Sequence, residues 1–349
     1  MTTDPLVQRL PFGECEGVPI EQVVLRTAAG AEARIINWGA VLRDLVVPLL
    51  NGRRQRVVLG LPTLADYLAY SPHFGSVEGR LANRLAEARF TLDGRIVQVA
   101  ANRGSRHALH GGDHGFGRRP WRFGAVGAGA ATLILSSPEG DCGYPGAVTV
   151  SCTYRLLEPA TLRLELTAVA DAPTPLNLCH HAYFNLDGSA TIGEHRLTIA
   201  ADYYTPTDSD LIPTGDIRSV TDTPYDFRAE RPVGDAKREG GPASLDVNMV
   251  LRRALSGAAV VPQSAARLRS PVNGLVLDVI TTEPGLQLYD GAKVNVPVPG
   301  HDGVRYGAYA GICLEPQHFP DSPNHPHFPD TILRPGAIYR QVTEYRFSI

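Results

Sequence analysis

The chain has 349 residues, 43% of them hydrophobic, and a formal net charge of −3 at pH 7. This length and composition suffice for a sizeable buried core, and the weak negative charge argues against nucleic acid or an anionic membrane surface as a partner. No apolar stretch reaches the roughly 18 residues of a membrane-spanning helix, and residues 1–10 lack the basic start and apolar core of a signal peptide. Five cysteines without a CxxC pair indicate reduced thiols, so we expect a cytoplasmic protein.

Glycine and proline interrupt the chain throughout, with 35 and 28 copies. This frequency disfavours long helices and favours many short strands. Neither an internal repeat nor a linker is visible, so we predict one large β domain over residues 1–349. The elements predicted in its first part are strands at residues 23–25, 33–38 and 41–47, a short helix within 61–70, and a hairpin at 90–94 with an Asp-Gly turn.

Three polar residues follow the predicted helix, and a lone carboxylate occurs much later in the chain. Arg80 and Arg84 flank Asn83 among small residues, and Asp246 stands alone between apolar residues. The planar guanidinium of arginine can grip sugar hydroxyls or a carboxylate. A surface salt bridge is the alternative at these positions.

Two histidine motifs lie in the middle of the chain. His110 precedes paired glycines in Leu-His-Gly-Gly, which allow close backbone approach and are expected to leave the imidazole exposed on a turn. Around His181, a period of two places Cys179 and His181 on one face and His180 on the other, so the adjacent histidines cannot serve one site. A structural histidine remains an alternative at each position.

The stretch from Ile312 to Gln317 places a single carboxylate, Glu315, after an apolar run. Because successive strand residues point to opposite faces, Cys313, Glu315 and Gln317 are predicted to share one face. A buried acid is costly unless it is paired or takes part in chemistry. A structural carboxylate held by backbone donors and a catalytic one both remain open from this stretch alone.

Several familiar catalytic motifs are absent, including G-x-S-x-G, H-E-x-x-H and the phosphate-binding P-loop. Cys179 or Cys313 as a nucleophile is disfavoured because small buried cysteines are usually inert. His318, His325 and His327 are close in sequence but lie in a proline-rich loop without the regular spacing of a metal site, so we expect no metal and no cofactor. The remaining inventory, one glutamate base and a histidine acid, suits proton transfer.

A series of short motifs runs through nearly the whole chain. In order they are Asn37-Trp-Gly-Ala, Leu59-Gly-Leu, Gly79-Arg-Leu-Ala-Asn-Arg84, Leu109-His-Gly-Gly112, His181-Ala-Tyr-Phe-Asn-Leu186, Leu211-Ile-Pro-Thr-Gly215, Asp226-Phe-Arg228 and Leu314-Glu-Pro-Gln317. Each motif is weak alone, but their order and spacing are specific. On these motifs the chain resembles the aldose 1-epimerase (galactose mutarotase) family.

The resemblance implies an all-β fold, a single large antiparallel β-sandwich with few short helices and an open sugar cleft. It also implies a cofactor-free isomerase, monomeric or homodimeric, whose partner is a small aldose such as glucose or galactose. In the family pattern Glu315 takes the proton of the anomeric hydroxyl and His181 protonates the ring oxygen, so the ring opens, rotates about C1–C2 and recloses on the other face. Sugar hydroxyls would be held by His110, Arg84, Asn83, Asp246 and Gln317.

Two positions depart from the family pattern, which commonly has Asn in place of His180 and His in place of Val247. The first change is expected to be mild, because that side chain points away from the partner of Glu315. The second is expected to retune recognition of one hydroxyl, which bears on the preferred sugar.

Three alternative functions stay open. An epimerase of phosphorylated hexoses would need cationic groups such as Arg80, Arg84 and Arg106 to converge on a phosphate. A glycosidase would use Glu315 and Asp246 at a separation of about 5–5.5 or about 6.5–9.5 Å. A sugar-binding module would bind without turnover.

Overall fold

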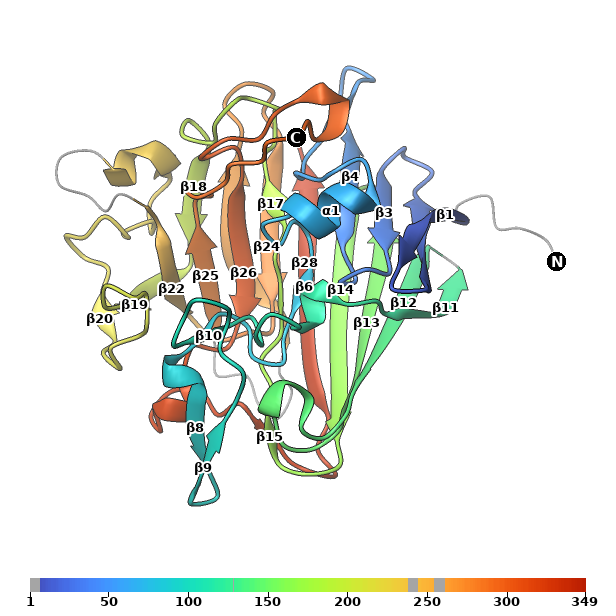
Figure 1. Ribbon diagram of the computed structural model, residues 1–349. Helices are drawn as coiled ribbons and strands as arrows, with labels where there is room; N and C mark the ends of the chain where they lie inside the picture. Colours follow the sequence, from blue (N-terminus) through green and yellow to red (C-terminus); the bar gives the residue numbers. More distant parts are fainter. Residues whose placement is uncertain (1–6, 128, 238–243, 254–260) are drawn as a thin grey trace.

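The computed structural model describes residues 7–127, 129–237, 244–253 and 261–349 (Figure 1). Three large antiparallel sheets contain most of its strands. The five-stranded sheet follows chain order, with β1 (Val7–Cys15), β2 (Val18–Arg26), β3 (Glu32–Ile36), β4 (Leu42–Pro48) and β5 (Arg54–Arg56). The nine-stranded sheet has the order β11 (Arg122–Gly127), β12 (Ala130–Ser137), β13 (Val148–Leu157), β14 (Thr161–Ala170), β28 (Tyr339–Ser348), β24 (Val276–Thr281), β23 (Gln263–Arg269), β18 (Arg196–Ile199) and β21 (Arg231–Pro232).

The six-stranded sheet carries the functional residues described below. Its order is β17 (Tyr183–Phe184), β26 (Ile312–Gln317), β25 (Gly285–Tyr289), β22 (Asp246–Leu251), β19 (Ala201–Thr205) and β20 (Arg218–Ser219). Short ladders pair β6 (Val77–Glu78) with β16 (Cys179–His180), β7 (Arg84–Leu85) with β10 (Ala108–Leu109), β8 (Arg89–Leu92) with β9 (Arg95–Gln98), and β15 (Thr174–Pro175) with β27 (Ile332–Leu333). The helices are α1 (Leu64–Tyr70) and the 3-10 turns η1 (Ala86–Ala88), η2 (Phe116–Arg118), η3 (Asp141–Gly143), η4 (Val233–Lys237), η5 (His301–Gly303) and η6 (Ser322–Asn324).

One hydrophobic core joins the three large sheets. Leu25 of β2, Leu314 of β26 and Leu164 of β14 come from different sheets, and all are buried in the same cluster. Apolar side chains from alternate strand positions thus meet between the layers, which is the arrangement of a sandwich. The predicted all-β antiparallel sandwich is confirmed, while the single domain over residues 1–349 stays a prediction. Within the described ranges, no helix combines the length and apolar character needed to cross a membrane.

Local signals account for the first elements of the chain. Thr63 caps α1 by accepting a hydrogen bond from the backbone N–H of Asp66 at 3.1 Å. Asp93 and Gly94 join β8 to β9 with φ of +48° and +80°, as a tight hairpin turn requires. The predicted helix within 61–70 and the predicted Asp-Gly hairpin are therefore confirmed.

The strand around His181 changes partner in mid-course. Cys179 and His180 form β16 and pair with β6, whereas β17 begins at Tyr183 and pairs with β26. His181 belongs to neither ladder, although its side chain keeps the face predicted from the period of two. The break sets the imidazole where the small ladder meets the six-stranded sheet.

Candidate active site

Three neighbouring strands, β22, β25 and β26, supply one wall of the site (Figure 1). Gln287 of β25 lies directly opposite Glu315 of β26 in the register. Its amide Nε2 donates to Asp246 Oδ1 of β22 at 2.6 Å. Antiparallel pairing and alternation thereby place two carboxylates and one amide on the same face of the sheet.

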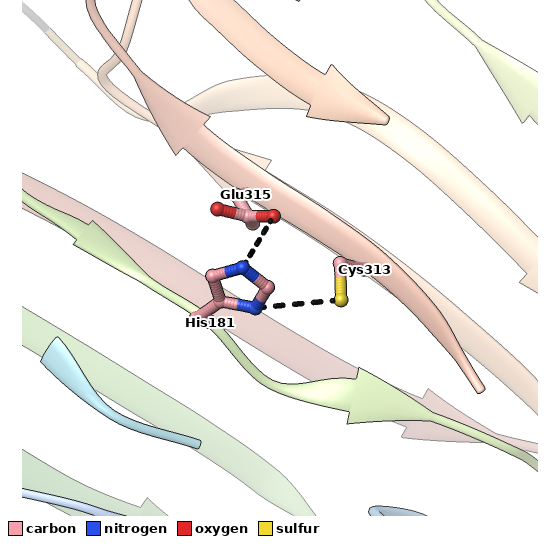
Figure 2. Close-up of side chains that lie close together, drawn as sticks. All are labelled: His181, Cys313 and Glu315. Carbon is pink, nitrogen blue, oxygen red and sulfur yellow. Dashed lines mark hydrogen bonds and ion pairs between the residues drawn. The ribbon is translucent and has the colours of Figure 1, made fainter. Parts of the chain in front are cut away.

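His181 and Glu315 are in direct contact. The imidazole Nε2 lies 3.5 Å from Glu315 Oε1, and both side chains are almost fully buried. Figure 2 shows the imidazole between Glu315 and Cys313, which both come from β26. The Cys313 Sγ lies 3.5 Å from His181 Nδ1, while the Cys179 thiol donates to Glu315 Oε2 at 3.2 Å. The faces predicted for both strands are correct.

A cavity of about 210 Å³ opens onto this pair. Its volume is below the roughly 300–1,000 Å³ of pockets for drug-sized ligands, which suits a ligand as small as one sugar ring. Gln317 does not line the cavity, and its side chain is completely buried. The other predicted site residues all line it: Asn83, Arg84, His110, His181, Asp246 and Glu315.

His110 enters the cavity from a turn that only glycine permits. A Cβ at Gly111 would lie 2.2 Å from the carbonyl oxygen of Gly79, and the φ of Gly111 is +83°. The His110 Nδ1 accepts a hydrogen bond from the backbone N–H of Asn83 at 3.2 Å. Burial lowers the pKa of His110 well below its ordinary value, so the ring is neutral and presents Nε2–H as a donor. The prediction of an exposed imidazole was wrong, since His110 is only 6% exposed.

Arg84 and Asp246 form an ion pair in the cavity wall. Their side chains approach to 3.7 Å, and the backbone N–H of Arg84 donates to Asn83 Oδ1 at 2.8 Å. Burial raises the pKa of Asp246, and Arg84 and Gln287 act against that shift. The arginine fork and the carboxylate together offer donors and acceptors for neighbouring hydroxyls of a sugar.

Comparison with known proteins bears directly on this arrangement. A family model described as aldose 1-epimerase matches residues 21–346. The chain belongs to the aldose 1-epimerase family. It is 38% identical to galactose mutarotase of Mus musculus over 98% of this chain and 99% of that protein, and 34% identical to aldose 1-epimerase of Escherichia coli over 95% and 96%.

Solved structures of related proteins have the same fold. The crystal structure of an aldose epimerase homologue from C. elegans superposes with a TM-score of 0.88 at 33% identity and covers 94% of this chain and 98% of that one. The galactose 1-epimerase structure from Lactobacillus acidophilus has a TM-score of 0.82 at 27% identity and covers 98% of both chains. The protein is accordingly an isomerase with the galactose mutarotase fold, and it acts on a small-molecule sugar. The expected cytoplasmic location and the expected monomer or homodimer stay predictions.

The two departures from the pattern of the aldose 1-epimerase family both lie in the core. The His180 ring packs against Tyr154, and its Nδ1 lies 3.2 Å from the Tyr345 hydroxyl. Val247 is 3% exposed and belongs to the main hydrophobic cluster, on the opposite face of β22 from Asp246. Neither residue lines the cavity, so Val247 makes no direct contact through which it would retune recognition of a sugar hydroxyl, as had been expected.

The arginines weighed for a phosphate do not converge. Arg80 is 2% exposed, and its guanidinium donates to the backbone carbonyls of Pro145 and Gly146, each at 2.8 Å. Arg106 is exposed and pairs with Asp210 at 2.8 Å. Only Arg84 of the three reaches the cavity. Arg80 thus stabilises the surrounding loops, and neither of the two alternatives left open for it, a substrate contact or a surface salt bridge, describes its contacts.

One cluster in the site has the residue types of a metal centre. Among the described residues, His181, Cys313 and Glu315 form the one group whose ligand atoms all lie within 4.8 Å of one another. Their closest contacts use different nitrogens of the same imidazole, Nδ1 toward the thiol and Nε2 toward the carboxylate. A single ion cannot use both ring nitrogens at once. This geometry suits proton transfer better than metal binding.

The histidines of the loop after β26 are engaged elsewhere. His318 Nδ1 lies 2.8 Å from Glu283, His325 Nε2 lies 3.3 Å from Asp321, and His327 Nε2 lies 2.7 Å from the carbonyl oxygen of Gly215. They do not form a ligand cluster among the described residues. The absence of a bound metal stays a prediction for this member of the family.

Burial perturbs the catalytic pair in opposite directions. It raises the pKa of Glu315 well above its ordinary value and lowers the pKa of His181 to about 3. Both shifts favour the neutral forms, because each charged form loses hydration. Glu315 acts as a base only when it is ionised, so burial by itself opposes the charged forms that the base and the acid require.

Sequence reasoning missed several residues that line the cavity. They are Pro72, His73, Leu109, Tyr183, Gln287, Tyr289 and Lys293. Gln287 lies opposite Glu315 in the strand register, and this pairing could not be read from the local sequence. His73 sits in a loop of proline, glycine and serine that gave no periodic signal. Its buried partner Glu78 lies in a two-residue strand between Ser76 and Gly79, which also gave no periodic signal.

Proposed function

We propose that this enzyme interconverts the α and β anomers of free hexoses such as glucose and galactose. The observation that carries the proposal is the His181 Nε2 to Glu315 Oε1 contact of 3.5 Å in a cavity of about 210 Å³. Two titratable groups at this separation can act on two oxygens of one bound ring. Each general acid or base of this kind typically contributes about 10²–10⁴ in rate.

In the proposed reaction Glu315 accepts the proton of the anomeric hydroxyl while His181 donates a proton to the ring oxygen. The C1–O5 bond breaks, the open aldehyde rotates about C1–C2, and the reverse transfers close the ring on the other face. The pair carries one proton throughout. A sugar hydroxyl that donates to Glu315 and a ring oxygen that accepts from His181 favour the charged form of each group, which counteracts the effect of burial on their pKa values.

The remaining polar groups of the cavity are proposed to hold the sugar. His110 presents a neutral Nε2–H donor, and the Arg84–Asp246 pair offers donors and acceptors side by side. Asn83 positions both neighbours, since its backbone N–H reaches His110 and its side chain reaches Arg84. Gln317 receives no sugar contact in this proposal because it lies outside the cavity lining.

Polarimetry of freshly dissolved α-D-glucose and α-D-galactose tests the proposal. We expect the wild-type protein to accelerate the approach to anomeric equilibrium, and His181→Asn and Glu315→Gln each to lose at least about 10² of that rate. Glu139→Gln, an exposed carboxylate away from the cavity, serves as the control.

Wild-type protein that binds these sugars without accelerating their mutarotation would overturn the proposal in favour of a sugar-binding module. Two further assays test for a phosphorylated substrate and for cleavage of a glycosidic bond. A preference for glucose 6-phosphate over glucose would indicate an epimerase of phosphorylated hexoses, and release of sugar from aryl glycosides would indicate a glycosidase.

A further inference from the structure

A third imidazole, that of His73, also lines the cavity, beside the His181–Glu315 pair of the proposed reaction. His73 lies in the loop between α1 and β6, with φ of +71°. Its ring centroid is 4.7 Å from that of His110 and 5.6 Å from that of His181, with the latter pair stacked at 22°. The side chain is 19% exposed, so the ring is accessible from the cavity.

His73 is held by a buried carboxylate. Glu78 of β6 is 1% exposed, and its Oε1 lies 2.9 Å from His73 Nδ1. The Ser76 hydroxyl also donates to the same oxygen. Burial by itself raises the pKa of Glu78, but the neighbouring histidines and the serine hydroxyl outweigh burial and keep it below its ordinary value.

The ionised carboxylate of Glu78 fixes which nitrogen of the His73 ring carries the hydrogen. It accepts the hydrogen bond from His73 Nδ1–H and so leaves Nε2 as the nitrogen available to a ligand. A buried carboxylate is costly unless it is paired, and among the described residues its ion pair is with His73. The loop and the strand are therefore built to present this ring in one orientation.

Neither of the other two imidazoles is oriented by a carboxylate outside the reacting pair, because His181 Nε2 faces Glu315, its proposed partner in the reaction. His110 Nδ1 accepts from a backbone N–H, and His181 Nδ1 faces the thiol of Cys313. A carboxylate that orients an imidazole is the arrangement by which enzymes prepare a histidine for catalysis.

We propose that His73 is a further catalytic residue, whose Nε2 accepts a hydrogen bond from a sugar hydroxyl beside His181 and so stabilises the partial positive charge that develops on the sugar as its ring oxygen takes up a proton. Glu78 is its positioning residue. This inference rests on the proposed mutarotase function and adds a residue to the same site. Hydrogen bonds that strengthen as charge develops raise the rate more than they tighten binding of the substrate.

The test uses His73→Asn, Glu78→Gln and the double variant in the polarimetric assay. Asparagine tolerates positive φ, so the loop keeps its conformation. We expect His73→Asn to lower kcat/KM at least 10-fold, mainly through kcat, and Glu78→Gln to lower it about 5- to 10-fold. The double variant should match His73→Asn within twofold, because Glu78 acts only through His73. The exposed His114, replaced by asparagine, is the control.

Thermal unfolding of each variant separates catalysis from folding. Wild-type kcat/KM in folded His73→Asn would overturn the inference, and so would additive losses in the double variant. If His73→Asn does not fold, Glu78→Gln with unchanged kcat/KM overturns it. An inactive wild-type protein would instead refute the proposed function itself, so the two failures are distinguishable.

Discussion

Replacing Glu315 by glutamine should stabilise the protein while removing its activity. The carboxyl group is 1% exposed, and its closest polar partners are the neutral thiol of Cys179 and the imidazole of His181. Burial raises its pKa well above the ordinary value of 4.5. Glutamine keeps the shape of the side chain and its acceptor oxygen toward Cys179 but has no charge to bury.

The size of this stabilisation follows from the difference between the pKa of Glu315 in the folded and in the unfolded protein. A group whose pKa is raised by folding contributes stability below its unfolded pKa, and this contribution is lost as the pH rises through the folded value. Each unit by which folding raises the pKa of Glu315 costs the wild type about 1.36 kcal/mol relative to glutamine once the pH exceeds the folded value. Because Cys179 and Arg84 relieve part of this cost, we expect a gain of roughly 1–3 kcal/mol.

Thermal unfolding between pH 5 and pH 8 measures this difference. An unfolding entropy of about 2.1 cal/mol/K per residue converts the gain into a rise in Tm of roughly 1–4 °C at pH 7.5, and the rise should shrink toward pH 5. The exposed Glu139→Gln variant should show no such trend. A Tm for Glu315→Gln that equals the wild-type value, or a difference independent of pH, would refute the reasoning.

Substitutions at two further positions separate structural from catalytic roles. Arg80→Met should cost about 3–5 kcal/mol in urea unfolding, because it leaves the carbonyls of Pro145 and Gly146 without their donor, while KM of the folded enzyme stays within twofold. A large rise in KM with little loss of stability would show instead that Arg80 contacts the substrate. Cys179→Ala removes a donor that lowers the pKa of Glu315, so kcat/KM at pH 7 should fall about 2- to 10-fold by polarimetry, and Cys179→Ser should restore it. Equal rates in both cysteine variants would contradict a role for this hydrogen bond.

The faces of the catalytic strands could be predicted from the sequence because they depend on neighbouring residues alone. A period of two suffices to put Cys313 with Glu315 and Cys179 with His181, and the structure bears out both pairs. The same period separates His180 from the site. The ordered motifs around these residues were enough to indicate the family that the comparisons then established.

The remaining features of the site depend on pairing between segments that lie far apart in the sequence. Cys179 and Glu315 are 136 residues apart, and no local pattern states which strands will be neighbours. Whether a given arginine or histidine is buried also depends on which loops cover it, and this is why Arg80 and His110 were misjudged.

The sequence by itself determined that this is an all-β chain with an acid and a base on known strand faces, because alternation is a property of the local backbone. Only the tertiary structure decided that Glu78 supports His73 beside His181, and that burial raises the pKa of Glu315. Proximity and desolvation arise when distant segments pack together, and both are set by the fold as a whole.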